Sequence, residues 1–462
     1  MAEDIIQEKG VEDTEARIQA LLEVVTSLMA LDDEAGLRKL LNQEHSADVA
    51  DVLRRVDDET TQRLFAYLDS TQAAEALVES DASTLRTIVD DLEHEALSGL
   101  VEEMAPDDAV DVLAELDEEH AAQVLNFMDE EEAQELQDLL AHEEDTGGGL
   151  MTPDFVLVHE GATVGDALIA LQNEEEAADL FYVFVVDDEN RPVGAISIHK
   201  LVRAKPNQLV NTIMTKDVVT VGYDTDQEEI AHIFGRYNLM AMPVVDEAGR
   251  LVGRITADDV MDVIEEESSE DIYKMAGTSH DETKNLWVFG VARSRLPWLM
   301  ICLVGSIFSG AVIHLFEATL SQVIALAAFL PVITATGGNS GLQASTVTVR
   351  GLVTGQVSSG LILKTVFREC GIALVIGLTC GATASCVAWF WLGETLVGIC
   401  VGLAMFLAIS VAVLMGVLVP MTFDRLGIDP AIASGPFITT TNDILGFFIY
   451  LGLATLMLQY LS

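Results

Sequence analysis

The charge of this chain is confined to one part of it, and this division constrains the fold more than any other feature. Residues 291–462 contain six Lys or Arg and six Asp or Glu, out of totals of 24 and 75. The first 290 residues therefore hold 18 bases and 69 acids, which account for the whole net charge of −51. A surface this negative repels nucleic acid and attracts cations. The acids are either a salt-adapted solubility surface or, in part, sensors of divalent cations.

Five apolar segments of the neutral part are long enough to cross a bilayer core of roughly 30 Å. We expect spans at about residues 296–317, 320–349, 369–391, 395–420 and 431–460. All six basic residues fall in the segments 291–295, 350–368 and 421–430. The positive-inside rule places these segments in the cytoplasm, and with them the acidic part. We therefore predict a multi-pass protein of the plasma (inner) membrane, with its N-terminus cytoplasmic and its C-terminus outside.

Two of these segments carry polar groups at membrane depth. The second contains Pro331 and Gly337-Gly338, which we expect to break the helix, next to Asn339. The fifth carries Asp443 within PFITTTNDILG, residues 436–446. A carboxylate at the centre of a spanning helix costs roughly 2.5–3.5 kcal/mol on insertion scales, so it marks a functional site. No Lys or Arg lies within the spans, which leaves a cation or a proton as its partner.

The ligand chemistry around Asp443 favours a hard cation. Carboxylate, hydroxyl, amide and carbonyl oxygens suit Mg²⁺, Ca²⁺ or Mn²⁺, and no Cys or His accompanies Asp443 in its segment. Mg²⁺ dehydrates reluctantly, so one carboxylate per chain can hold the hydrated ion through its water shell. Two symmetric chains would supply two carboxylates, which predicts a pore on the twofold axis of a homodimer.

The acidic part begins with a predicted helical superhelix domain over residues 1–146. Apolar residues recur there at helical spacing, and Asp or Glu often precedes an apolar run as an N-cap. Residues 48–57 resemble residues 108–117 at an offset of 60, which favours stacked helix pairs. The three glycines at 147–149 then predict a flexible break.

A second internal repeat follows the glycines. Residues 150–158 (LMTPDFVLV) recur as residues 213–221 (IMTKDVVTV), and residues 185–197 recur as residues 244–256. This tandem is similar to a pair of CBS domains, an α/β fold that we place at residues 147–258. The resemblance implies that Thr256 and Asp259, in a Thr-x-x-Asp motif, can hold a nucleotide such as ATP. The first repeat has Lys200 in place of the Asp.

A strongly acidic helix is predicted over residues 259–276, within a connecting region at residues 259–290. Glu267, Glu270 and Asp271 share one face of it at spacings of three and four. Like charges so placed destabilise a helix unless a cation binds between them. The alternative interpretation is a solvated linker helix. The remaining region, residues 291–462, is the predicted transmembrane domain of five helices.

In this order the parts resemble the MgtE family of magnesium channels and transporters, through the GGNxG segment at 337–341 and the PFxTTxxD segment at 436–443. The resemblance implies a homodimer with Mg²⁺ as its substrate, and Mn²⁺ or Co²⁺ as further candidates. It implies inward flux driven by the membrane potential and closure by intracellular Mg²⁺. It assigns the ion-binding carboxylate to Asp443 and a plug helix to residues 259–276. The pore-lining positions that it implies are Gly338, Asn339, Thr346, Thr439 and Gly446. The regulatory Mg²⁺ ligands that it implies are Glu267, Glu270, Asp271, Asp429, Asp226, Asp259 and Asp262.

Two other functions stay open on the residues alone. A membrane-anchored nucleotide sensor would use the CBS pair and would not need Asp443. A proton- or sodium-coupled solute carrier would use Asp443 as its proton site and predicts pH-coupled uptake. An enzyme is not expected, because the chain contains no Walker A loop, H-E-x-x-H or G-x-S-x-G motif.

Overall fold

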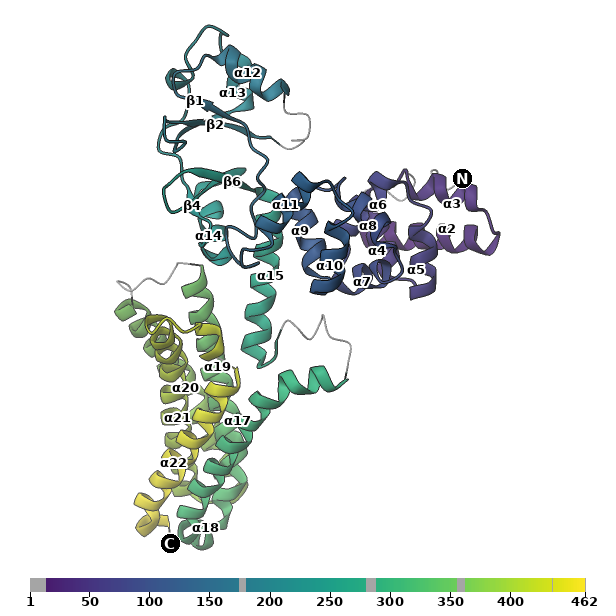
Figure 1. The fold of residues 1–462 in the computed structure, drawn as a ribbon. Coiled ribbons are helices and arrows are strands. Elements are labelled where there is room, and N and C mark those ends of the chain that lie inside the picture. Colours follow the sequence, from purple (N-terminus) through teal and green to yellow (C-terminus); the bar gives the residue numbers. More distant parts are fainter. Residues whose placement is uncertain (1–13, 174–179, 280–287, 355–361, 434, 462) are drawn as a thin grey trace. The chain divides into compact units, whose positions relative to one another are not determined.

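The computed structural model describes residues 14–173, 180–279, 288–354, 362–433 and 435–461. The chain divides into two compact units, Met1–Ile264 and Glu265–Ser462. Part of the predicted linker before the first span, residues 280–287, lies outside the described residues. Figure 1 shows a first unit of short helices and two small sheets, and a second unit of long helices.

The first unit begins with a run of short helices. They are α2 (Thr14–Ala30), α3 (Glu34–Leu41), α4 (Ser46–Arg54), α5 (Asp58–Phe65), α6 (Ser70–Val78), α7 (Ala82–Val89), α8 (His94–Val101), α9 (Pro106–Ala114), α10 (Glu118–Leu125) and α11 (Glu130–Leu139). Helices two positions apart pack on each other, as α4 does on α6 and α6 on α8, so their apolar faces form one continuous core. The predicted superhelix of stacked helices is confirmed.

These helices begin at a fixed interval of 12 residues. From α3 to α11 the N-cap residues are Asp33, His45, Asp57, Asp69, Asp81, Glu93, Ala105, Asp117 and Asp129. All six of the Asp caps accept a hydrogen bond from a backbone N–H of the first turn. Such caps stabilise a helix by about 1 kcal/mol each. The repeat seen at an offset of 60 is therefore five periods of 12, and a share of the acid surplus has a structural role.

The prediction of a flexible break at residues 147–149 is wrong. The N–H of Gly147 donates to the Thr225 carbonyl and that of Gly148 to the Tyr223 carbonyl, both at 2.7 Å. A Cβ at Gly147 would lie 2.7 Å from the Gly222 carbonyl oxygen, and one at Gly148 would lie 2.6 Å from the His142 ring. The glycines allow a close approach of backbone segments, so they form an ordered junction.

Two three-stranded sheets follow, one for each repeat. The first consists of β1 (Leu157–His159), β2 (Tyr182–Val186) and β3 (Pro192–Ser197), and it packs with α12 (Val164–Asn173) and α13 (Ile198–Arg203). The second consists of β4 (Val221–Gly222), β5 (Ala241–Val245) and β6 (Leu251–Thr256), with α14 (Gln227–Tyr237). In each sheet the first pair of strands is parallel and the second is antiparallel. A 3-10 turn, η1 (Val210–Thr212), lies between the two repeats.

The two repeats exchange their first segments. Thr152 of the first repeat bridges Arg254 on β6, and Thr215 of the second repeat bridges Ala195 on β3. The sequence repeats at 150–158 and 213–221 therefore occupy equivalent positions on opposite sheets. This pseudo-symmetric α/β pair is the CBS arrangement that the repeats predict.

The acidic helix is α15 (Ala257–Ala276), as predicted for residues 259–276, and the boundary between the two units falls within it. The second unit continues with α17 (Val288–Leu315), α18 (Glu317–Gln322), η2 (Ile324–Phe329), α19 (Leu330–Val353), α20 (Ile362–Leu392), α21 (Thr395–Arg425), η3 (Pro430–Ala433) and α22 (Gly435–Leu461). Among the described residues, five helical stretches are long and apolar enough to cross a membrane. They coincide with the five expected spans.

The second span differs from the prediction in where its helix is interrupted. α19 runs without a break through Gly337-Gly338, and Pro331 lies in its first turn, where a missing N–H is tolerated. The irregular backbone lies earlier, where α18 ends at Gln322 and the short 3-10 helix η2 begins. The glycines serve helix packing instead, as described below.

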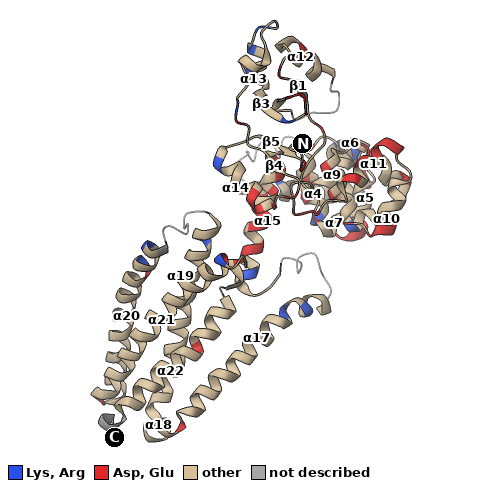
Figure 2. Ribbon diagram, turned by 60° about the vertical axis from the view of Figure 1, so that its left-hand side comes forward, with Lys and Arg blue, Asp and Glu red and all other residues tan. Residues whose placement is uncertain are grey.

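The distribution of charge follows the two units. Figure 2 shows acidic residues spread over the helices α5, α7, α10 and α11 and over α15, whereas the helices α17 to α22 are almost free of charge along their length. This confirms the division that the sequence shows between an acidic part and a neutral, apolar part.

Candidate cation sites

Helices α19 and α22 lie against each other, and each carries a dense set of polar side chains. On α19, Asn339, Gln343 and Thr346 are exposed and recur at spacings of four and three, so they form one polar row along the helix. On α22, Thr439 is exposed and Asp443, one turn further on, is partly exposed. A polar row in a spanning helix needs a wet cavity or another polar surface beside it.

The predicted pore-lining residues separate into two groups. Asn339, Thr346 and Thr439 are exposed on the single chain, whereas Gly338 and Gly446 are buried at the contact between α19 and α22. A Cβ at Gly338 would lie 3.6 Å from Thr439, and one at Gly446 would lie 3.9 Å from Thr334. Both distances are ordinary van der Waals contacts, so these two glycines pack at the helix contact and do not face the exposed polar row.

Asp443 has no Lys or Arg partner among the residues that the structure describes. Its neighbours on α22 are Thr439, one turn earlier, and Asn442, which is buried against α19. A carboxylate with no basic partner at this depth, beside hydroxyls and amides, offers the ligand set of a hard cation that keeps its water.

A second cluster lies at the end of α15. The Nζ of Lys274 is 2.7 Å from a carboxylate oxygen of Glu270 and 2.8 Å from one of Asp429, which precedes η3. Burial, the charge of Asp429 and the charge of Glu270 raise the pKa of Asp271, although Lys274 opposes this. Burial tends to lower the pKa of Lys274, but its hydrogen bonds to Asp429 and Glu270 raise it above its ordinary value.

The structure thus brings together three of the four predicted regulatory carboxylates near the membrane unit: Glu270, Asp271 and Asp429. The sequence prediction missed Lys274, whose ammonium group now lies between two of them. Its spacing of four residues from Glu270 was the available signal. The fourth predicted residue, Glu267, lies one turn earlier on the same helix.

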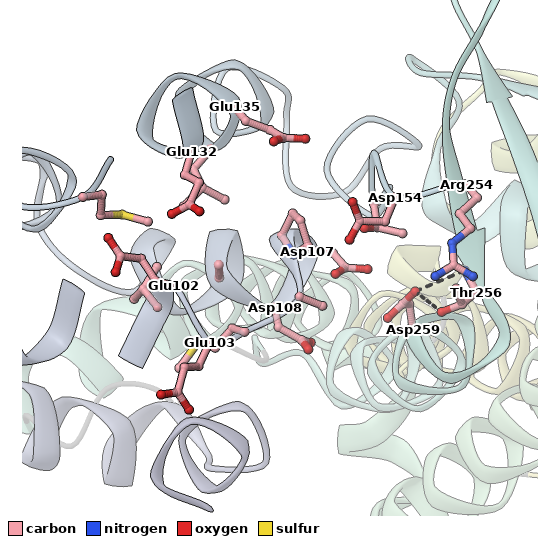
Figure 3. A pocket seen from close by; sticks show the side chains of 18 of the residues that line it. Glu102, Glu103, Asp107, Asp108, Glu132, Glu135, Asp154, Arg254, Thr256 and Asp259 are labelled. Carbon is pink, nitrogen blue, oxygen red and sulfur yellow. Dashed lines mark hydrogen bonds between the residues drawn. The ribbon is translucent and has the colours of Figure 1, made fainter. Parts of the chain in front are cut away.

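A third acidic cluster lines a cavity of about 440 Å³ in the first unit. Figure 3 shows carboxylates from several elements around it, with Thr256 and Arg254 of β6 on one side. The acids that line the cavity are Glu102, Glu103, Asp107, Asp108, Glu132, Glu135, Asp154, Asp258 and Asp259. They come from the loop before α9 and its first turn, from α11, from the segment after the glycines, and from the start of α15.

The carboxylates of this cavity lie close enough to perturb one another. Burial, then the charges of Asp259 and Asp108, raises the pKa of Asp107 to about 8. Burial and neighbouring carboxylates, Asp259 first, raise the pKa of Asp108 to about 6. Burial also raises the pKa of Asp259, although its hydrogen bonds from Thr256 oppose the shift. One Asp107 carboxylate oxygen is buried without a hydrogen-bond partner. Perturbed carboxylates of this kind are typical of a functional site.

Of the regulatory ligands predicted around the second CBS module, Asp259 and Asp262 lie at or near the acidic cavity and Asp226 does not line it. Asp259 lines the cavity, and Asp262 is near enough for its charge to raise the pKa of Asp108 and of Asp259. Asp226 is the N-cap of α14, where it accepts from the Glu228 N–H at 2.9 Å, and it does not line the cavity. Thr256 donates to Asp259 at 2.5 Å, so the Thr-x-x-Asp pair is hydrogen-bonded to itself.

Sequence reasoning missed Asp107 and Asp108, the most perturbed carboxylates of the cavity. They follow Pro106 in the first turn of α9, where acids commonly stabilise the helix dipole. Nothing in the sequence separates them from the other first-turn acids. Among the described residues, no three His, Cys, Asp or Glu side chains converge on one metal-sized position.

The fold and these sites define a class: a multi-pass membrane protein with five spans, joined to a helical domain and a CBS pair. The family models agree along the chain. A divalent cation transporter family, MgtE, matches residues 330–453, the MgtE intracellular N domain matches residues 44–145, and CBS domains match residues 148–207 and 210–266.

Two curated relatives are magnesium transporters MgtE. That of Bacillus subtilis is 36% identical over 324 residues, which cover 70% of this chain and 72% of the relative. That of Thermus thermophilus is 38% identical over 329 residues, with coverage of 70% and 72%. The solved cytosolic domain of the Mg²⁺ channel MgtE in complex with ATP is 33% identical, with a TM-score of 0.50, and covers 52% of this chain and 99% of that one.

This chain belongs to the MgtE family of magnesium transporters. The relatives are transporters, which confirms the prediction that the protein is not an enzyme. Family membership supports Mg²⁺ transport and argues against a nucleotide sensor without a transport role.

Proposed function

We propose that the protein is a homodimeric Mg²⁺ channel of the plasma (inner) membrane, with its N-terminus in the cytoplasm and its C-terminus outside. The observation that carries this proposal is Asp443, a partly exposed carboxylate in a spanning helix with no basic partner among the described residues. The polar row of Asn339, Gln343 and Thr346 on the neighbouring helix α19 is exposed on the single chain. A second copy would enclose both surfaces around a wet path.

Two Asp443 carboxylates, one from each copy, would neutralise one divalent ion. The hydroxyls and amides around them would bind its water shell, which suits Mg²⁺ and would also admit Mn²⁺ or Co²⁺. Moving two charges across 100 mV releases about 4.6 kcal/mol, so the membrane potential alone would concentrate Mg²⁺ on the order of 10³-fold. Such a pore needs a mechanism that closes it.

The two acidic clusters supply that mechanism. In the cavity of the first unit, burial and the charges of Asp259 and Asp108 keep Asp107 protonated at pH 7, and a hydrated Mg²⁺ would displace this proton and stabilise the three ionised carboxylates together. At the end of α15, Glu270, Asp271 and Asp429 are neutralised only in part by Lys274. Intracellular Mg²⁺ would therefore bind better to the state in which these carboxylates are close together. We take this state to be the closed one, so the transported ion limits its own entry.

A nucleotide at the CBS pair is a second proposal, and it rests on the solved relative that contains ATP. Thr256 and Asp259 are the residues that this proposal assigns to the ribose. Both residues line the acidic cavity, and its nine carboxylates, Asp259 among them, would repel the phosphates of a free nucleotide. We therefore expect ATP to bind with its phosphates outside this cavity or together with a divalent cation.

The test of the proposed function is Mg²⁺ influx into proteoliposomes under an inside-negative potential, with a Mg²⁺-sensitive dye inside. We compare the unaltered protein with Asp443→Asn, which removes the charge at constant shape. The matched control is Asp424→Asn, an exposed carboxylate near the end of α21. Influx in the unaltered protein and in the control, with none in Asp443→Asn, is the expected result. Influx that persists in Asp443→Asn would refute the proposed pore at Asp443. Influx that does not depend on the membrane potential would refute the proposed driving force.

A further inference from the structure

Asn442, the residue next to Asp443, is buried inside the membrane unit. Only 4% of its surface is exposed, although its side chain is an amide. Its Nδ2 donates to the backbone carbonyl of Thr334 on α19 at 3.3 Å. A buried amide in a spanning helix is unfavourable unless it is hydrogen-bonded, so this contact holds α22 to α19.

The opposite surface of α19 is shaped to receive this amide. A Cβ added at Gly337 would lie 3.0 Å from the Asn442 Nδ2 and 3.1 Å from its Oδ1. A Cβ at Gly338 would lie 3.7 Å from the same Nδ2. Gly337 therefore leaves the space that Asn442 fills, and any larger residue at 337 would push the amide away, whereas a Cβ at Gly338 would make only an ordinary contact.

Successive side chains on a helix are about 100° apart. When Asn442 faces α19, the side chain of Asp443 is turned to the adjacent sector of α22, on the side of Thr439, one turn away. The hydrogen bond to the Thr334 carbonyl, with the contacts Gly337–Asn442 and Gly446–Thr334, also fixes the height of Asp443 between Thr334 and Gly337 of α19. A leucine at 442 would still pack in the membrane, but it would specify neither the rotation nor the height.

We propose that Asn442 is a positioning residue for the ion pathway. It sets the rotation and axial position of α22 against α19, and so the place of the Asp443 carboxylate in the pore. This inference rests on the proposed role of Asp443 and adds a residue that acts through it. The expected consequence is in ion discrimination, because a displaced carboxylate still attracts cations but holds the water shell of Mg²⁺ less well.

The chain offers a matched control further along α22. The hydroxyl of Tyr450, which is fully buried, donates to the Leu326 carbonyl at 2.9 Å, and so also ties α22 to the second span. It lies eight residues from Asn442, or about 12 Å along a helix. Tyr450→Phe removes an interhelical hydrogen bond without touching the surroundings of Asp443.

The experiment measures initial rates of Mg²⁺ and Ca²⁺ influx into proteoliposomes, with the KM for Mg²⁺, for the unaltered protein, Asn442→Leu, Gly337→Ala, Tyr450→Phe and Asp443→Asn. Dimer content and Tm are measured on the same preparations. We expect Asn442→Leu and Gly337→Ala each to lower the Mg²⁺ to Ca²⁺ ratio of kcat/KM by about 3- to 20-fold, the range for one interhelical hydrogen bond in a membrane. Tyr450→Phe should lower the Tm and leave that ratio unchanged.

The outcomes separate the two proposals. Unchanged discrimination in Gly337→Ala and in any folded Asn442→Leu overturns the positioning role, and so does an equal loss in Tyr450→Phe, which would indicate general helix packing. Gly337→Ala keeps the test valid if Asn442→Leu does not fold, because it adds a single methyl group. Normal influx in Asp443→Asn overturns the proposed pore itself, whatever the other variants do.

Discussion

The cavity of the first unit allows a quantitative prediction for Asp107→Asn. In the metal-free protein the pKa of the Asp107 carboxyl is about 8, because it is buried among other carboxylates, against an ordinary value of 3.8. Folding must therefore protonate this group at pH 7. Over the roughly three pH units between 3.8 and 7, at 1.36 kcal/mol per unit, the cost is on the order of 4 kcal/mol.

The sign of the pH dependence follows from the direction of the shift. A carboxyl whose pKa is raised on folding favours the folded state at low pH, and this contribution is lost as the pH rises from about 4 to about 8. The metal-free protein should thus be least stable above pH 8. Mg²⁺ binds the ionised carboxylates, so it displaces a proton below pH 8. Its apparent affinity should rise about tenfold per pH unit between pH 6 and 8.

Asp107→Asn removes the charge while it keeps the shape of the side chain. The buried amide still needs hydrogen-bond partners, which offsets part of the gain. We expect the metal-free Tm at pH 8 to rise by about 5–15 °C, which corresponds to about 2–4 kcal/mol in a unit of this size. The same substitution should weaken the stabilisation by Mg²⁺ and flatten its pH dependence.

The assay is thermal unfolding of the purified protein at pH 5.5, 7 and 8.5, with and without Mg²⁺, followed by circular dichroism. The matched control is Glu95→Gln, an exposed acid in the first turn of α8 that does not line the cavity. It should change neither the Tm nor the response to Mg²⁺. The reasoning is refuted if Asp107→Asn lowers the metal-free Tm at pH 8.5, or if Mg²⁺ stabilises the unaltered protein equally at pH 5.5 and 8.5.

Two further predictions concern the other contacts. Lys274→Met removes the ammonium group between Glu270 and Asp429, so the carboxylates should bind Mg²⁺ more tightly. The internal Mg²⁺ concentration that halves influx should therefore fall by about 2- to 10-fold, measured in proteoliposomes loaded with graded Mg²⁺. An increase in that concentration would contradict this prediction. Gly148→Ala introduces a methyl group against the His142 ring, so we expect a lower Tm of the first unit. The control is Gly99→Ala, where the added Cβ meets nothing within 4 Å and the substitution should be neutral or stabilising. Equal Tm values for the two variants would show that the glycine junction is not tightly packed.

Sequence patterns predicted the elements whose signal is periodic or long. The five spans, the CBS repeats and the acidic helix α15 all have such a signal, and the structure contains each of them, although the first span begins at Val288, eight residues before the expected start. The glycines were interpreted less well. Residues 147–149 were expected to be flexible and Gly337-Gly338 to break a helix, yet both sets lie at close contacts. A glycine in the sequence shows only that a side chain is absent. The segment that packs against the glycine, and so requires this absence, lies elsewhere in the sequence.

The two kinds of carboxylate site differ in how far the sequence reveals them. Asp443 is conspicuous because charge is rare in a spanning helix, so its type and place alone distinguish it. Asp107 has the same chemistry, but it belongs to a part of the chain with 69 acids, many of which cap helices at the 12-residue interval. What separates Asp107 from a capping Asp69 is burial against Asp108 and Asp259, which depends on residues far apart in the sequence coming together. In a highly acidic chain we therefore expect a cation sensor to contain buried carboxylate oxygens that lack a donor, whereas each capping Asp accepts a backbone N–H. The unpaired, buried oxygen of Asp107 meets this criterion, and the six capping Asp side chains do not.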